Sequence, residues 1–307
     1  MNKSLLLFVL ILLAVCVSLP EACGKSSYEQ VQMWYTEGRD WRAQGEPDKA
    51  MAVFLKAAHS GTDDEALLGR VWSNIAEICR QADEHMLADQ IYAAAAEHFA
   101  ASKDAQAYAN ALNDMAWERA VMGYKDSALA LIDAAMEVYP LYPLSDKAME
   151  THAVACLTAE EYDSVLYYTM PPDNNCRMLL RAQAYAAMQI NDSAVWYART
   201  LLEWTDDLSY MDDIYHILMH NDPDADDEMI SELSAKRMEV QQALGQRHGK
   251  LVKAVRLLLD DRLAQPTDWR AILELSLMGC LCLVAALLGI MTILQRRRTF
   301  RQWKDEE

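Results

Sequence analysis

Basic residues are scarce in this 307-residue sequence. Lysine and arginine together number 28 against 46 aspartates and glutamates, which leaves a net charge of −18 at neutral pH. Proteins that bind nucleic acid need the opposite balance, because their lysines and arginines must neutralise phosphates. The same excess of acid opposes a position flat against an anionic membrane surface. The composition therefore predicts a well-solvated protein that does not bind nucleic acid.

The sequence also lacks the common motifs of catalysis and metal binding. It has no glycine-rich phosphate loop, no recognisable nucleophile motif and no cysteine pair with metal-ligand spacing. His216 and His220 are four residues apart, but no glutamate follows the first histidine as it does in zinc proteases. The acidic run 222–228 lacks the glycine of a calcium loop, and Leu233 stands where that loop needs a glutamate. We therefore expect neither an enzyme nor a metal or cofactor site.

The sequence has instead a recurring pattern of small and aromatic residues at helical spacing, which predicts that these residues form a core. Three stretches follow the pattern closely and two later ones follow it less well. The three clear copies contain Trp34, Gly38, Trp41, Gly45, Ala50, Phe54 and Ala57; Trp72, Ile75, Ala76, Ala88, Tyr92 and Ala95; and Leu112, Met115, Ala116, Gly123, Ala128, Ile132, Ala135 and Pro140. The weaker copies contain Met149, Ala153, Cys156 and Val165, and Met178, Ala182, Tyr185, Ala194, Ala198 and Leu201.

This pattern resembles the tetratricopeptide repeat (TPR), a 34-residue helix–turn–helix unit. The resemblance covers residues 28–204 and implies an all-α solenoid of stacked helical hairpins, in which small residues let the helices approach closely. The spacing between copies drifts from the family period, so we expect longer turns near 61–65 and 101–105. Proteins of this family bind other proteins, so the resemblance implies a binding scaffold.

In that family, one face of the first helix of each hairpin lines a concave groove that binds the partner. Some members hold a peptide's terminal carboxylate there, but only Asn74 agrees with their pattern, and Asp114 would repel such a group. Carrying over the groove positions and Asn74 gives ten candidate partner-binding residues: Tyr35, Arg39, Arg42, Arg70, Asn74, Glu77, Arg80, Asn110, Asn113 and Trp117.

Four of these candidates are arginines, namely Arg39, Arg42, Arg70 and Arg80. Arginine makes bidentate hydrogen bonds to carboxylates and phosphates, so the four together suggest an acidic protein or peptide as partner. The alternative is that they pair within the fold, with carboxylates such as Glu37, Asp40 and Glu77.

Both ends of the chain carry apolar segments. Residues 1–24 read as a secretory signal, with lipidation of Cys23 as an alternative to simple cleavage. The apolar run 271–294 would form a helix ~36 Å long, enough to cross a ~30 Å hydrocarbon core, and a basic tail follows at 295–307. The positive-inside rule then predicts a single-pass protein of the bacterial inner membrane, with periplasmic repeats and a cytoplasmic C-terminus.

Residues 205–265 are expected to form capping or stalk helices. Apolar residues between Ile230 and Leu258 recur at heptad spacing, while Gly245 and Gly249 weaken the centre of the segment. Two helices that close the solenoid and one long stalk that pairs into a homodimer both remain open.

These features together predict a membrane-anchored scaffold or sensor subunit of the bacterial envelope. The order of segments also resembles bacterial regulators that join exported repeats to a cytoplasmic DNA-binding domain. Only 13 residues follow Leu294. The alternative function is therefore the ligand-sensing half of a transmembrane regulator that lacks its cytoplasmic output domain.

Overall fold

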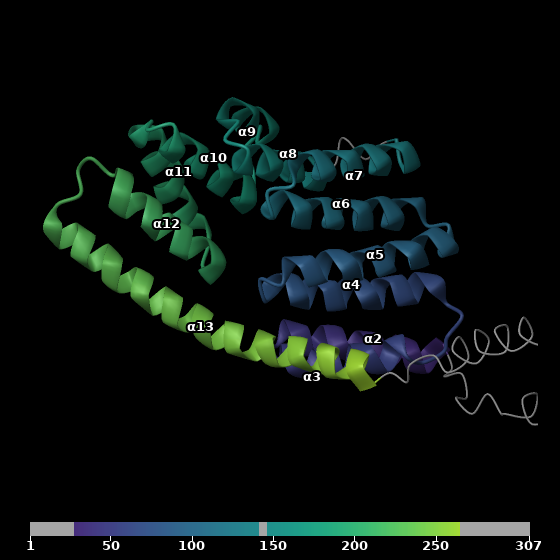
Figure 1. Ribbon diagram of the computed structural model, residues 1–307. Coiled ribbons are helices and arrows are strands. Elements are labelled where there is room, and N and C mark those ends of the chain that lie inside the picture. The colour runs from purple at the N-terminus through teal and green to yellow at the C-terminus, as the bar shows by residue number, and fades with distance from the viewer. Residues whose placement is uncertain (1–27, 141–145, 265–307) are drawn as a thin grey trace, which may run out of the picture. The chain divides into compact units, whose positions relative to one another are not determined.

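The computed structural model describes residues 28–140 and 146–264, and most of these residues are helical (Figure 1). The all-α prediction is therefore confirmed. The chain divides into two compact units, residues 1–258 and 259–307, and the first contains all of the helical hairpins. In chain order the helices of the described residues are α2 (Tyr28–Ala43), α3 (Pro47–Ala58), α4 (Glu65–Gln81), α5 (His85–Ser102), α6 (Ala105–Val121), α7 (Lys125–Val138), α8 (Asp146–Thr158), α9 (Tyr162–Tyr168), α10 (Asn175–Ala187), α11 (Asn191–Trp204), α12 (Leu208–Asn221) and α13 (Asp227–Ala264).

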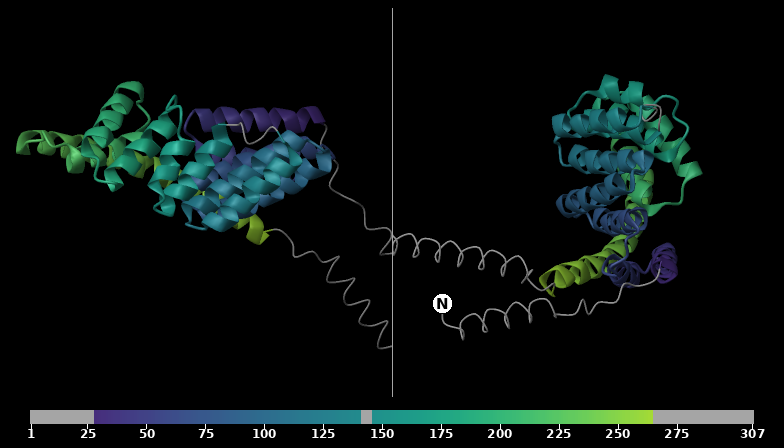
Figure 2. Two further views of the ribbon diagram at one scale, coloured as in Figure 1. Left: turned by 90° about the horizontal axis from the view of Figure 1, so that it is seen from above. Right: turned by 90° about the vertical axis from the view of Figure 1, so that its right-hand side faces the viewer.

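Helices α2 to α11 form hairpins that stack in sequence order, as Figures 1 and 2 show. The pairs are α2 with α3, α4 with α5, α6 with α7, α8 with α9, and α10 with α11. Successive hairpins also pack together, for example through α3 against α4 and α5 against α6. One hairpin cannot bury its apolar face alone, so stacking is what forms the core. This arrangement is consistent with the predicted helical-repeat solenoid.

The small and aromatic residues of the pattern supply that core. Most of them are buried, including Ala50, Phe54, Ala76 and Tyr92, and Trp41 and Trp72 are partly buried. Gly38 shows why a small residue is needed, because a Cβ at this position would lie 2.5 Å from Cε1 of Phe54. The α2–α3 contact therefore depends on the missing side chain.

The turns between hairpins agree with the sequence in one place and not in the other. Residues 59–64 separate α3 from α4, near the long turn expected at 61–65. The long turn expected near 101–105 is wrong, because α5 continues to Ser102 and α6 begins at Ala105. Lys103 ends α5 in the left-handed conformation, and the side chain of Asp104 caps α6 by accepting a hydrogen bond from Ala107 N at 3.0 Å. Alanine favours the helix, so the residues expected to lengthen this turn extend the alanine-rich α5 instead.

The C-terminal part of the first unit consists of α12, which packs on α10 and α11, and of the long helix α13 as far as Leu258. α13 is a single helix of 38 residues, so Gly245 and Gly249 do not divide it. Its residues Leu251, Ala254 and Leu258 are buried in the same apolar cluster as residues of the first hairpin. The heptad residues in this part of α13 are thus covered within the chain.

The membrane-spanning part of the predicted fold class is contradicted. Among the helices of residues 28–140 and 146–264, none combines the length and the apolar character that crossing a bilayer requires. α13 is long enough, but charged residues such as Arg247, Lys250 and Arg256 recur along it. The predicted span 271–294, the signal 1–24 with Cys23, and the tail 295–307 lie outside the described residues.

Candidate functional site

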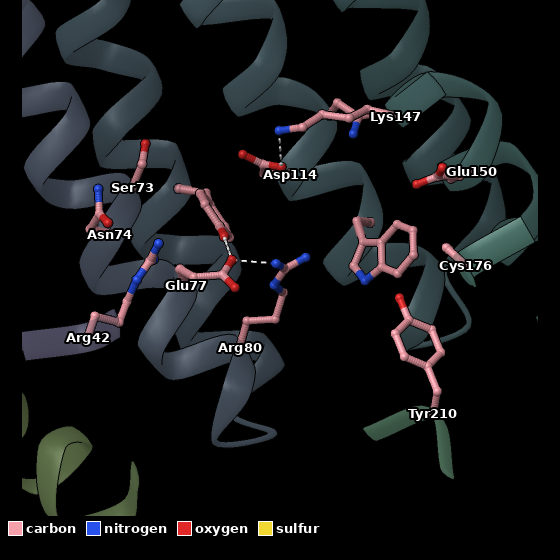
Figure 3. Close-up of a pocket in the computed structure, with 13 residues that line it drawn as sticks. Arg42, Ser73, Asn74, Glu77, Arg80, Asp114, Lys147, Glu150, Cys176 and Tyr210 are labelled. Atoms are coloured by element: carbon pink, nitrogen blue, oxygen red, sulfur yellow. Dashed lines mark hydrogen bonds and ion pairs between the residues drawn. The ribbon is translucent and has the colours of Figure 1, made fainter. Parts of the chain in front are cut away.

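A polar pocket of about 430 Å³ lies between the first helices of successive hairpins (Figure 3). Its residues come from α2, α4, α6, α8 and α10, with one residue each from α5 and α12. Six of the ten predicted binding residues line it: Arg42, Asn74, Glu77, Arg80, Asn113 and Trp117. The remaining lining residues are Ser73, Tyr92, Asp114, Lys147, Glu150, Cys176 and Tyr210.

Helix α4 contributes the largest share of the pocket because of its amphipathic spacing. Ser73, Glu77 and Arg80 are separated by four and three residues, so they lie on one face of the helix. The opposite face carries buried residues such as Ile75 and Ile78. The core therefore fixes the rotation of α4 and turns its polar face toward the pocket.

An ion pair between Glu77 and Arg80 occupies the centre of the pocket (Figure 3). Tyr92 Oη donates a hydrogen bond to Glu77 at 3.1 Å, and Gln81 Nε2 donates another at 3.0 Å. Burial alone would raise the pKa of Glu77, but the charge and hydrogen bond of Arg80 outweigh it and lower that pKa. Burial likewise opposes the charge of Arg80, yet Glu77 holds the Arg80 pKa above its usual value. Both groups are therefore ionised at neutral pH.

Two further carboxylates of the pocket also have cations within reach. Lys147 Nζ lies 3.7 Å from Asp114 Oδ1, where burial raises the pKa of Asp114 and the lysine opposes that rise. Glu150 Oε1 lies 3.8 Å from Arg177 Nε and accepts a hydrogen bond from Asn174 at 2.9 Å. Each carboxylate that lines the pocket thus has a cation within 4 Å, although Arg177 also pairs with Asp146 at 2.6 Å and with Asp173 at 3.0 Å.

Two polar groups of the pocket keep unused bonding capacity. No hydrogen bond or ion pair joins the side chain of Arg42 to a described residue, although its charge helps to lower the pKa of Glu77. Asn113 is only 2% exposed, and its Oδ1 has no hydrogen-bond partner within the described part of the chain. A buried acceptor without a partner is unfavourable, so Asn113 is suited to receive a donor from a ligand.

Four predicted residues do not line this pocket: Tyr35, Arg39, Arg70 and Asn110. The Tyr35 ring packs near Phe54, and the guanidinium of Arg39 lies 5.8 Å from the centre of the Tyr35 ring. Arg70 is exposed and its carbonyl accepts a hydrogen bond from Asn74 at 2.8 Å. The structure therefore brings Arg42 and Arg80 to one pocket but leaves Arg39 and Arg70 outside it. Arg80 pairs with Glu77, as the alternative interpretation proposed.

Several residues of the pocket were missed by sequence reasoning. Lys147 and Glu150 belong to α8, in the copy where the repeat pattern is weak, so no groove position could be assigned to them. Tyr210 lies on α12, beyond the last copy. Tyr92 was predicted to be a core residue, which is correct for its ring, while its hydroxyl reaches Glu77.

No protein-family model matches this chain, and no similar curated protein was found. Among the residues that the structure describes, no group of three histidine, cysteine or acidic side chains is placed to hold a metal ion. Cys79 and Cys156 are buried, and neither these two nor Cys176 forms a disulfide within the described residues. The pocket thus offers charge and hydrogen bonding as its means of recognition.

Proposed function

We propose that the chain is a protein-interaction scaffold of the tetratricopeptide-repeat type, and that its pocket binds an acidic segment of a partner protein. The stacked hairpins and the repeat pattern support the scaffold. The pocket is bordered by the first helices, which are the helices that line the groove in that family. The proposal for the ligand depends on the charges of the pocket.

The observation that carries the proposal is the Arg42 guanidinium, which lines the pocket and forms no ion pair or hydrogen bond with a described residue. The other charged lining residues form the pairs Glu77–Arg80 and Asp114–Lys147, and Glu150 faces Arg177. A ligand carboxylate at Arg42 would make a charge-assisted, bidentate contact with its guanidinium. Arg42, Asn74 and Glu77 lie together on one side of the pocket, with Glu150, Cys176 and Tyr210 on the other (Figure 3).

The uncharged groups favour a peptide segment over an isolated anion. Asn113 Oδ1 needs a donor, and a peptide backbone supplies N–H groups at every residue except proline. Trp117 and Tyr210 add aromatic surface, which is effective at protein contacts because it buries a large area with few rotatable bonds. A short extended segment with one acidic side chain satisfies both unused groups.

The proposal is tested with the full-length chain and a displayed library of random peptides. We expect the selected peptides to share an aspartate or glutamate. The variant Arg42→Glu should bind them at least about tenfold more weakly, because a salt bridge is replaced by repulsion. Arg39→Glu is the matched control, since Arg39 is on the same helix but outside the pocket.

The outcome for Arg39 decides between the pocket and a wider groove. Binding that falls equally in the Arg39→Glu and Arg42→Glu variants would contradict the proposed site. Selected peptides without any acidic residue would contradict the proposed ligand.

A further inference from the structure

Helix α13 is anchored at two separate places within the first unit. Near its start, Arg237 Nε donates a hydrogen bond to Asp212 Oδ1 of α12 at 2.9 Å, and Leu233 packs against the last hairpin's apolar cluster. Farther along, Leu251, Ala254, Val255 and Leu258 are at most 6% exposed and join the apolar cluster that contains the first hairpin. Figures 1 and 2 show α13 running from α12 to the helices α2 and α3.

The stretch between these anchors has few contacts. Residues 245–249 are all exposed, and a Cβ placed on Gly245 or Gly249 would meet no atom within 4 Å. His248 Nδ1 lies 3.9 Å from Asp83 Oδ2, and both side chains are exposed. Glycine costs about 1 kcal/mol relative to alanine inside a helix. The middle of α13 is therefore its least stable part, and the second anchor can be released without unfolding the first.

The second anchor contacts the turn that follows Arg42. Lys250 Nζ donates hydrogen bonds to Glu46 Oε1 at 2.7 Å and to the Gly45 carbonyl at 3.2 Å. This turn ends α2, and Arg42 lies in the last turn of that helix. Two backbone hydrogen bonds also close this turn, from Gly45 N to the Arg42 carbonyl and from Glu46 N to the Trp41 carbonyl, each at 3.0 Å. Helix ends are the parts of a helix that fray, so contact with α13 adds a second restraint on the backbone that carries Arg42.

We propose that residues 250–258 of α13, the α13 clamp, position Arg42 for ligand binding. This inference depends on the proposed function, because it concerns the same pocket. With the clamp docked, the end of α2 is ordered before the ligand arrives, and binding does not incur the cost of ordering it. With the clamp released, Arg42 moves with a frayed helix end and affinity falls. Because the coupling is reciprocal, ligand at Arg42 must also favour the docked clamp.

A matched pair of double variants tests the clamp in the full-length chain. Leu251→Asp with Leu258→Asp places two charges on the buried face of α13. Val252→Asp with Leu257→Asp places the same two charges on the exposed face, where these residues are 39% and 40% exposed. The readouts are the affinity for a peptide selected on the wild-type protein, and amide hydrogen exchange in residues 40–46.

We expect the buried-face variant to bind the peptide about tenfold more weakly, which corresponds to about 1.4 kcal/mol. Exchange in residues 40–46 should become faster, while α6 to α11 keep their protection and so show that the hairpins remain folded. The exposed-face variant should behave as the wild type. Equal affinity in the buried-face variant and the wild type, or equal loss in both variants, would overturn the clamp.

The Lys250–Glu46 pair gives a second test that leaves the apolar face intact. Lys250→Glu and Glu46→Lys should each weaken binding by about two- to threefold, since an exposed ion pair contributes little. The double swap should restore part of the loss, because Lys250 also donates to the Gly45 carbonyl and Glu46 also pairs with Lys49. No restoration would count against the clamp. If no peptide binds the wild type, the proposed function fails, and exchange in the unliganded chain decides the clamp: unchanged exchange in residues 40–46 of the buried-face variant would overturn it.

Discussion

Glu118 on α6 is a carboxyl group without exposed surface, directly behind the pocket. His85 Nδ1 lies 2.8 Å from Glu118 Oε2, and Arg80 Nε lies 3.8 Å from Oε1. Burial raises the pKa of Glu118 to about 7, against the lowering effects of His85 and Arg80, and the like charge of Glu77 adds to the rise. The same Arg80 also pairs with Glu77 in the pocket. The charge of Glu118 is therefore linked to the packing of α4, α5 and α6.

We predict that Glu118 makes the protein less stable as the pH rises through about 7. The folded-state pKa lies above the ordinary value of 4.5, so the folded protein binds the proton more tightly than the unfolded chain. The contribution of Glu118 to the free energy of unfolding is fully present below pH 4.5. It is lost as the pH rises through the folded-state pKa, and the loss amounts to about 3 kcal/mol. Thermal unfolding of the wild type and of Glu118→Gln across this range measures the effect.

The comparison between the two proteins isolates Glu118 from the other titrating groups. Glutamine keeps the size of the side chain and cannot ionise, so the variant should lose less stability than the wild type between acidic and mildly alkaline pH. Parallel stability curves for the two proteins would show that Glu118 does not carry this dependence.

At the scale of the helix, glycine favours stability where two helices pack closely and reduces it where the helix faces solvent. Gly38 and Gly69 each let a phenylalanine ring approach the helix backbone, where an added Cβ would lie within 3 Å of ring atoms. Gly245 and Gly249 face open space on α13. The first pair contributes to packing, while the second lowers the stability of the helix that contains it.

We predict that Gly38→Ala and Gly245→Ala change stability in opposite directions. Gly38→Ala should destabilise the protein by about 1–3 kcal/mol, because Phe54 is fully buried and its ring has little room to move. Gly245→Ala should stabilise α13 by about 0.5–1 kcal/mol through helix propensity alone. Chemical denaturation measures both. A stabilised Gly38→Ala variant would contradict the described α2–α3 contact.

At the scale of the whole molecule, net charge and local charge oppose each other. The chain carries −18, whereas the proposed ligand contact is a single arginine in a pocket whose other charges are paired. Long-range repulsion acts on an approaching acidic peptide, and the contact at Arg42 acts only at short range. The long-range repulsion therefore affects the rate of association, and the contact at Arg42 affects the lifetime of the complex.

We predict that the association rate of an acidic peptide rises when ionic strength increases from low to physiological values. Salt screens the repulsion between two negatively charged molecules before they meet. Stopped-flow measurements with a selected peptide test this, and an uncharged variant of that peptide serves as the control. An association rate that falls with salt would indicate that the peptide approaches a locally positive surface instead.

Much of the helical fold could be predicted because the pattern is local and repeated. Phe54, Ala88 and Ile132 occur at spacings that only packed helices explain, and each is fully buried or nearly so. Asn113 and Arg42 were among the candidates because their positions on the first helices follow from the same register, and both line the pocket. The pairing of charges could not be predicted in the same way. Lys147 on α8 lies near Asp114 on α6, in the neighbouring hairpin, and no local spacing in the sequence indicates that contact.

By itself, the sequence determined the helices, the register of their apolar faces and the positions on the polar faces of the first helices. These features depend on residues three to four apart. Tertiary structure alone decided which charges are neutralised, where α13 packs, and that Arg42 forms no ion pair with another described residue. Those properties depend on residues far apart in the chain, such as Lys250 and Glu46, whose contact exists only after the hairpins have stacked.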